Sequence, residues 1–253
     1  MEHLSKERIV MRLKEVDSTN NYLKNLILDR PPEEGSLVIA DFQTAGRGQM
    51  GNGWFSDSGK NLLLSMVVYP EMLPANEQFI ISRIASLAVK NCLDQFVDDI
   101  RIKWPNDIYW RDKKIGGILI ENSVQGRYIK NSVIGLGLNI NQQNFPEDLP
   151  NPVSLKEITG IDSDIDNIVD IFVREFFMLY REFQQGEISQ IEDEYLLDLY
   201  RINDYYWYRD ENGSFKAKIE GVMPSGHLIL KTMDEGELRY YAFKEVSFIN
   251  SEG

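Results

Sequence analysis

A glycine-rich loop holds the residues with the clearest chemical potential. It runs from Asp41 to Trp54 and carries four glycines within the eight positions 46–53. Glycine permits positive φ angles and lets the backbone approach a ligand closely. Arg47 lies between the first two glycines, where a guanidinium and exposed N–H groups can meet an anion. We interpret this segment as a loop that grips an anionic ligand, with Trp54 offering an aromatic face.

The spacing Gly46-x-Gly48-x-x-Gly51 also matches the dinucleotide-binding fingerprint. That motif requires a helix that begins within the glycines and directs its N-terminus at the pyrophosphate. Residues 52–59 have poor helix propensity and no helical apolar period. The sequence therefore disfavours a dinucleotide fold, and a plain connecting loop is the remaining alternative to a ligand-gripping one.

Three further segments place a cation or an amide beside glycines or a tight turn. They are Lys103–Asp107, Lys114–Gly117 and Gly135–Asn139. Glycine inside a strand weakens it and often marks the close approach of a ligand or another backbone. Each lysine alone is typical of a solvated surface charge. The segments taken together favour a small ligand with an extended polar part and at least one anionic group.

Composition excludes several other functions. The net charge of −13 argues against nucleic acid as a partner. Two histidines in weak contexts and one cysteine leave no zinc constellation. Cys92 cannot form an internal disulfide, which fits a reducing compartment, and we expect a cytoplasmic protein. No run approaches ~18 apolar residues, so no membrane span is expected, and residues 1–12 lack the apolar region of a signal peptide.

A sheet with packed helices is needed to position these segments. Apolar runs predict strands at 8–16, 37–40, 62–69, 100–104, 108–110, 114–121 and 133–140. Helical periods predict helices from the caps Ser18 and Thr19 to about Asp29, and at 76–99, 164–183 and 188–200. A cap that faces a cleft can also present its hydroxyl and N–H groups to a ligand.

The pattern of the sequence changes near residue 205. Short strand-like pieces alternate with turns at 211–213, 224–226 and 234–236, and no helical period intervenes. This pattern predicts a small all-β module, a compact barrel. We therefore expect an α/β fold in two parts: a catalytic domain with a mixed β-sheet and packed helices over 1–204, and a small C-terminal β-barrel over 205–253.

The motifs follow the order seen in biotin–protein ligases, and from about residue 10 to 250 the chain resembles that family. The matching segments are Asp17–Asn20, Gln43–Gly48, Lys103–Asp107, Lys114–Glu121 and Gly135–Asn139. The resemblance is specific because the Lys-Trp-Pro-Asn-Asp turn and the Gly-Arg-Gly loop occur together with the Lys-x-x-Gly strand. It is closest to the short form, which lacks the N-terminal DNA-binding domain of repressor-type ligases. It implies a catalytic fold like that of class II aminoacyl-tRNA synthetases.

The resemblance also implies a reaction in two steps. Biotin's carboxylate attacks the α-phosphorus of ATP, giving biotinyl-adenylate and pyrophosphate. A lysine of a biotin carboxyl carrier domain then takes the biotin, and AMP leaves. Attack of one anion on another needs fixed positive charge, which Lys114 and Arg47 would supply as the catalytic residues. Mg²⁺ would accompany ATP, and the enzyme would be a monomer or a homodimer.

Residue roles carry over from the family motif by motif. The implied biotin-binding residues are Ser18, Thr19, Asn20, Gln43, Gly46, Arg47, Gly48, Gln49, Lys114 and Gly117. The implied ATP and adenylate residues are Arg47, Trp54, Asn106, Lys114 and Asn139. Trp54 would cover the adenine, and Asp107 would place either Lys114 or magnesium. The chain departs from the family at Gln49, where relatives often carry a second arginine, so one guanidinium reaches the phosphates.

Two alternatives to a biotin ligase belong to different classes. A lipoate–protein ligase of the same superfamily would share the adenylation chemistry and differ in its acyl pocket; the Gly-Arg-Gly loop and the Lys-Trp-Pro-Asn-Asp turn favour biotin. A non-catalytic small-molecule-binding protein would require Lys114 and Arg47 to be incidental. Pyrophosphate formation from ATP and biotin separates the last alternative from the enzymes.

Overall fold

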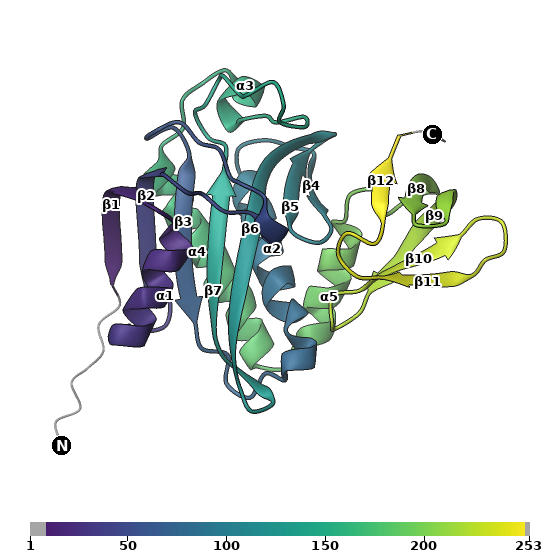
Figure 1. The fold of residues 1–253 in the computed structure, drawn as a ribbon, viewed down its shortest axis with the longest axis horizontal. Helices are drawn as coiled ribbons and strands as arrows, with labels where there is room; N and C mark the ends of the chain where they lie inside the picture. The colour runs from purple at the N-terminus through teal and green to yellow at the C-terminus, as the bar shows by residue number, and fades with distance from the viewer. Residues whose placement is uncertain (1–8, 251–253) are drawn as a thin grey trace.

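The computed structural model describes residues 9–250, and a seven-stranded mixed sheet forms its centre (Figure 1). The strands follow the order β1-β2-β3-β7-β6-β5-β4. Their bounds are β1 (Val10–Val16), β2 (Leu37–Gln43), β3 (Leu62–Val68), β4 (Ile100–Lys103), β5 (Asp107–Trp110), β6 (Lys113–Gln125) and β7 (Tyr128–Leu138). β1 runs parallel to β2, and the other neighbouring strands are antiparallel. The predicted mixed sheet is confirmed.

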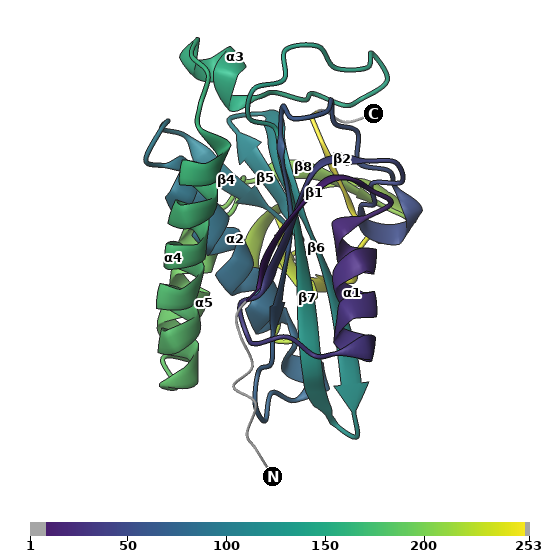
Figure 2. The same cartoon turned by 90° about the vertical axis from the view of Figure 1, so that its left-hand side faces the viewer.

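Helices cover both faces of this sheet (Figure 2). α1 (Thr19–Asp29) packs on one face, and α2 (Phe79–Leu93), α4 (Ile165–Gln184) and α5 (Ile188–Leu197) lie on the other. α2 is buried around most of its circumference because α4 and α5 cover the side that faces away from the sheet. At ~25 cal/mol per Å² of apolar surface, burial in these layers is the main stabilising contribution. No helix in the described part of the chain has the length and apolar character to cross a membrane.

Two local features depart from the helical periods. α3 (Leu155–Thr159) is too short to show a period, but Ser154 and Glu157 form a capping box and Gly160 ends the helix at φ 81°. α2 is shorter than the predicted helix over 76–99, because a 3₁₀ turn at Ala75–Glu77 precedes it and turns over 94–99 follow its end at Leu93.

The glycine-rich loop leads into a strand and not into a helix. A single 3₁₀ turn at Gln49–Gly51 is followed by extended backbone and then by β3. The loop closes on itself, since the Gly48 N–H donates to the Asn52 carbonyl at 2.6 Å and the Trp54 N–H donates to the Gly46 carbonyl at 2.9 Å. This geometry excludes the dinucleotide fold.

A second sheet, fully antiparallel, follows the helices in the order β11-β10-β9-β8-β12. Its strands are β8 (Tyr206–Asp210), β9 (Gly213–Val222), β10 (Leu228–Thr232), β11 (Leu238–Tyr241) and β12 (Ser247–Ile249). Within the described residues β11 and β12 do not pair, so the expected closed barrel is wrong. These edge strands have four and three residues, too few backbone groups to close the sheet on itself.

The second sheet packs against α2 and beside the β4–β5 turn. Buried Arg83 of α2 donates to the Val222 carbonyl at 2.5 Å and forms an ion pair with Glu192 of α5. Trp104 Nε1 donates to the Gly226 carbonyl at 2.9 Å. These contacts hold the β9–β10 turn against the central domain, and the ring of Phe243, in the loop that precedes β12, lies 6.3 Å from that of Trp104.

Candidate active site

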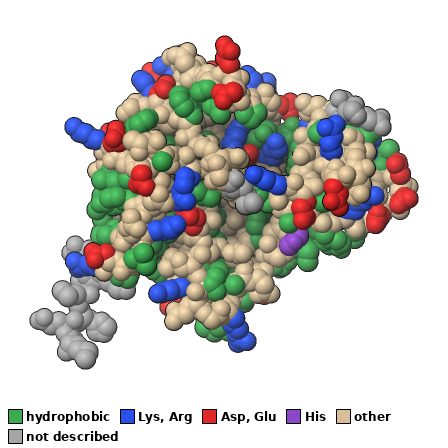
Figure 3. Space-filling view, viewed as in Figure 1, with side chains coloured by type: hydrophobic (Ala, Val, Ile, Leu, Met, Phe, Trp, Pro, Cys, Tyr) green, Lys and Arg blue, Asp and Glu red, His purple; other side chains and the backbone are tan. Residues whose placement is uncertain are grey.

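A cavity of about 560 Å³ lies between the glycine-rich loop, the central strands and the C-terminal sheet. Lys and Arg side chains gather around a hollow in the middle of this face (Figure 3). The predicted site residues that line the cavity are Ser18, Thr19, Asn20, Gln43, Arg47, Gly48, Gln49, Trp54, Asn106, Asp107, Lys114 and Gly117. Two others stand apart: Gly46 lines a neighbouring hollow, and buried Asn139 donates to the Val153 carbonyl at 3.1 Å.

The uncharged end of the cavity lies where β1, α1 and β2 meet. Ser18 has N-cap backbone angles, but its hydroxyl caps no helix N–H. Gln43 Oε1 takes that place and accepts hydrogen bonds from Thr19 N at 2.8 Å and Thr19 Oγ1 at 3.1 Å. Because β2 supplies the cap, the Ser18 hydroxyl and Gln43 Nε2 have no partner among the described residues and can serve a ligand.

A buried network fixes Asn20 beside this end. Its Nδ2 donates to Glu121 Oε2 at 2.9 Å and to the Leu119 carbonyl at 3.3 Å. The hydroxyl of Ser65, fully buried on β3, donates to Asn20 Oδ1 at 2.5 Å and lies 2.7 Å from Thr19 Oγ1. A satisfied buried network is rigid, so Asn20 holds one orientation.

Two interior glycines of β7 make room for protein side chains. Gly135 stands opposite Ser65 in the sheet, and a methyl group there would overlap Asn20 Oδ1. At Gly137 a methyl group would lie 2.5 Å from Cε2 of Trp54. The glycines therefore mark close approach, as the sequence indicated, but the groups that approach are Asn20 and Trp54.

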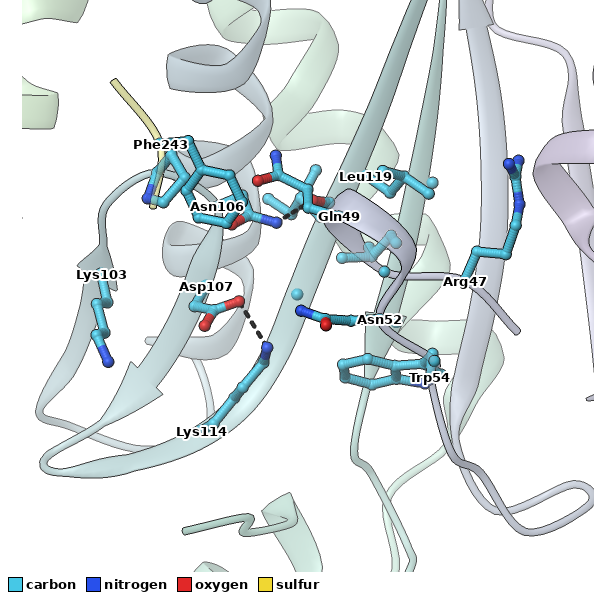
Figure 4. A pocket seen from close by; sticks show the side chains of 18 of the residues that line it. Arg47, Gln49, Asn52, Trp54, Lys103, Asn106, Asp107, Lys114, Leu119 and Phe243 are labelled. Atoms are coloured by element: carbon cyan, nitrogen blue, oxygen red, sulfur yellow. Dashed lines mark hydrogen bonds and ion pairs between the residues drawn. The ribbon is translucent and has the colours of Figure 1, made fainter. Parts of the chain in front are cut away.

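Lys114 and Asp107 form an ion pair inside the cavity (Figure 4). The Nζ–Oδ1 distance is 2.6 Å, and the two side chains are 31% and 24% exposed. Lys114 Nζ also lies 5.8 Å from the centre of the Trp54 ring. Asn106 holds the adjoining turn, since its Nδ2 donates to the Ile118 carbonyl at 2.6 Å. Asp107 thus fixes the ammonium group inside the cavity.

Arg47 points away from Lys114 (Figure 4). Its NH2 group lies 2.7 Å from Glu121 Oε2, and Lys24 Nζ lies 2.8 Å from Glu121 Oε1. Burial would raise the pKa of Glu121, but hydrogen bonds from Lys24 and Asn20 and the charge of Arg47 outweigh it and lower that pKa. The two predicted catalytic cations therefore do not meet in this structure.

Several lining or supporting residues were absent from the sequence prediction. The loop before β12 and β12 itself contribute Phe243, Lys244, Val246, Ser247 and Phe248. Only the packing of the second sheet reveals them. Ser65 did leave a signal, because it is the single hydroxyl in the otherwise apolar strand β3.

Comparison with known proteins identifies a matching family and similar proteins. The model of the biotin/lipoate A/B protein ligase family matches residues 13–139, half of the 253 residues. The bifunctional ligase/repressor BirA of Bacillus subtilis is 31% identical over 234 residues, which span 90% of this chain and 70% of the relative. The biotin–[acetyl-CoA-carboxylase] ligase of Paracoccus denitrificans is 28% identical over 229 residues, spanning 87% and 92%.

A solved structure has the same architecture. The biotin protein ligase from Aquifex aeolicus, in complex with biotin and ATP, matches with a TM-score of 0.79 and 26% identity, covering 97% of this chain and 100% of that one. The mixed sheet with its packed helices is thus the fold of a biotin ligase, as the resemblance implied. By its motifs, its fold and these matches, the chain belongs to the biotin/lipoate A/B protein ligase family.

Proposed function

We propose that the protein is an ATP-dependent biotin–protein ligase that forms biotinyl-5′-adenylate and transfers biotin to a lysine of a biotin carboxyl carrier domain. The observation that carries the proposal is a single cavity with an uncharged hydrogen-bonding end and a cationic end. Such a cavity suits an acid with a neutral polar head and the phosphates that activate it. The names of the relatives support the same reaction.

The uncharged end favours biotin over lipoate. Biotin's ureido ring carries a carbonyl and two N–H groups, which need donors and acceptors. Ser18 and Gln43 offer both, on a frame that Thr19 and Asn20 hold in place. A dithiolane ring would leave these polar groups without partners at ~1–3 kcal/mol each.

The cationic end supports the adenylation step. A carboxylate oxygen of biotin attacks the α-phosphorus, and the bond to the β-phosphate oxygen breaks with its electron pair on pyrophosphate. Lys114, held by Asp107, neutralises charge on the α-phosphate. Arg47 joins it only by exchanging Glu121 for the ligand, an exchange that a partly exposed ion pair allows.

The adenine would lie against the ring of Trp54. The ring packs against Gly137 of β7, and its buried Nε1 has no hydrogen-bond partner among the described residues. Asn106 lines the cavity, and its Oδ1 is not used by the hydrogen bond that its Nδ2 makes. Asn139, behind the strand end, would act by holding Val153 in place.

Magnesium would enter with ATP. In the described part of the chain no group of three or more His, Cys, Asp or Glu side chains could hold a metal ion. Asp107 is the one acid among the described residues that line the cavity. Mg²⁺ commonly takes one or two carboxylates with substrate phosphates and water, so the residues fit a MgATP substrate. We place the reaction in the cytoplasm, where the lone Cys92 stays a thiol.

The test is incubation with ATP and magnesium plus either biotin or lipoate, followed by mass analysis and then by addition of a carrier domain. We expect biotinyl-adenylate and a biotinylated carrier lysine. Lipoyl-adenylate alone would show a lipoate ligase. Absence of any acyl-adenylate and of pyrophosphate would reject the ligase.

A further inference from the structure

Lys103 is a cation of the cavity wall that the steps above leave without a role. It ends β4 and lines the cavity. Its Nζ donates to Tyr109 Oη at 2.8 Å and lies 4.6 Å from the centre of the Tyr109 ring and 5.5 Å from that of Phe248. Among the residues that the structure describes, no carboxylate forms an ion pair with it. Lys114, in contrast, has Asp107.

The surroundings of Lys103 favour an added anion. Burial lowers the pKa of Lys103; the charge of Asp107 opposes this effect, and the charges of Arg201 and Lys114 add to it. The aromatic rings of Tyr109 and Phe248 hold the ammonium without neutralising it. A partly desolvated cation that lacks a counter-ion gains more from an incoming anion than one that is already paired.

Strand order gives the cavity a direction. The uncharged end lies at the ends of β1 and β2, Lys114 is on β6, and Lys103 is on β4 at the far edge of the sheet. Lys114 therefore stands between the head-group end and Lys103. Figure 4 shows Lys103 and Arg47 on opposite sides of Lys114.

Phosphoryl and nucleotidyl displacements place the attacking and leaving oxygens roughly in line. If biotin's carboxylate reaches the α-phosphorus from the β2 side, pyrophosphate departs toward β4. We propose that Lys103 is a further catalytic residue that binds this pyrophosphate and stabilises the charge it gains as the bond to the α-phosphorus breaks. Lys244, in the loop before β12, also lines the cavity. The proposal rests on the ligase function above.

The experiment separates the two steps in Lys103→Met, which keeps the aliphatic stem and removes the charge. We expect the rate of adenylate formation to fall ~10-fold or more, and pyrophosphate–ATP exchange to require correspondingly more pyrophosphate. Transfer from supplied biotinyl-adenylate to the carrier lysine should change less than about twofold, because pyrophosphate has already left. Lys113→Met is the matched control: Lys113 is exposed and does not line the cavity, so both steps should keep their rates.

Equal losses in both steps, or no loss in the first, would overturn the role of Lys103. A wild-type protein that forms no adenylate would instead reject the ligase function and, with it, this role. A second measurement needs no variant: reductive methylation of wild-type lysines, read by mass spectrometry with and without pyrophosphate. Pyrophosphate should protect Lys103 and leave Lys113 unchanged. Equal labelling of Lys103 in the two samples would contradict the proposal even if Lys103→Met does not fold.

Discussion

The two ends of the cavity are built in different ways. At the uncharged end Thr19 and Asn20 are 4% and 3% exposed. The Ser65 hydroxyl forms hydrogen bonds with both side chains, and Gln43 accepts a hydrogen bond from the Thr19 N–H. At the cationic end the side chains of Arg47 and Lys114 are 38% and 31% exposed, and each is held by one carboxylate.

The difference matches what each end must do. A head-group site keeps one geometry throughout the reaction, so a buried network that is already ordered reduces the entropy lost on binding. The cationic end meets a carboxylate, a triphosphate, pyrophosphate and an incoming amine in turn. Partly exposed ion pairs are worth only ~0.2–1 kcal/mol, so a ligand anion can replace Glu121 at Arg47.

The largest expected effect comes from removing the charge at the cationic end. Lys114→Ala should reduce adenylation by at least ~10²–10³-fold, because the ammonium neutralises charge that develops on phosphate oxygens. The fold and the binding of biotin's head group should persist, since the buried network is untouched. Pyrophosphate release measures the adenylation rate, and thermal unfolding measures the stability of the fold. The exposed variant Lys113→Ala is the control for both. Near-normal pyrophosphate release, or an unfolded variant, would contradict this role.

One added methyl group should disrupt the hydrogen-bond network at the uncharged end. Gly135→Ala would displace Asn20 and disturb its bond with Ser65. Loss of one or two such hydrogen bonds at ~1–1.5 kcal/mol each should weaken biotin binding roughly tenfold to a hundredfold, with the KM for ATP unchanged. Calorimetric titration with biotin measures it.

A matched control exists in the second sheet. Gly221→Ala would place a methyl group 3.7 Å from Ile229 Cδ1, an ordinary contact, and should bind biotin normally. Equal biotin affinity of Gly135→Ala and wild type would show that Asn20 does not belong to the head-group site.

Local pattern predicted most of the fold. The apolar run Leu62–Val68, interrupted only by Ser65, becomes the fully buried strand β3, and the helical period over 164–183 becomes α4. The place of β7 between β3 and β6 depends on pairing between residues far apart in the chain, which periodicity does not encode. Closure of the C-terminal sheet failed as a prediction because it depends on the length of the two edge strands, and element boundaries are poorly defined by sequence.

The sequence also located most of the candidate site but not its contacts. The resemblance to biotin–protein ligases supplied twelve residues that share one cavity. It did not reveal that Arg47 pairs with Glu121, 74 positions away, because such a contact arises only when the glycine loop lies over β6. Likewise, glycines in β7 indicated a need for space, and only side-chain placement shows that Asn20 and Trp54 fill it.

A positive charge added to the glycine-rich loop should strengthen the binding of the adenylate phosphate at the cationic end. Gln49 lines the cavity, so Gln49→Arg would bring a second guanidinium to an adenylate phosphate. One charge-assisted hydrogen bond is worth ~1.5–3 kcal/mol, so release of biotinyl-adenylate should slow by roughly tenfold or more, without a matching loss in transfer. The off-rate of preformed adenylate measures it, with Gln49→Met as the uncharged control. Off-rates of wild type and Gln49→Arg within about twofold would show that position 49 does not reach the phosphates.

The smallest effect is expected at Glu121, which links the two ends of the cavity because it contacts both Asn20 and Arg47. Glu121→Gln keeps an oxygen acceptor for Asn20 Nδ2 and removes the charge that competes with the ligand for Arg47. With ~0.2–1 kcal/mol in that ion pair, biotin should bind up to about fivefold more tightly. Glu121→Ala is the contrasting variant: it frees Arg47 but also leaves Asn20 Nδ2 with one acceptor fewer, so biotin should bind more weakly than in Glu121→Gln. Calorimetric titration of the two variants decides between the roles. If both weaken biotin binding to the same extent, the carboxylate charge itself supports the head-group end, and Arg47 does not exchange Glu121 for the ligand.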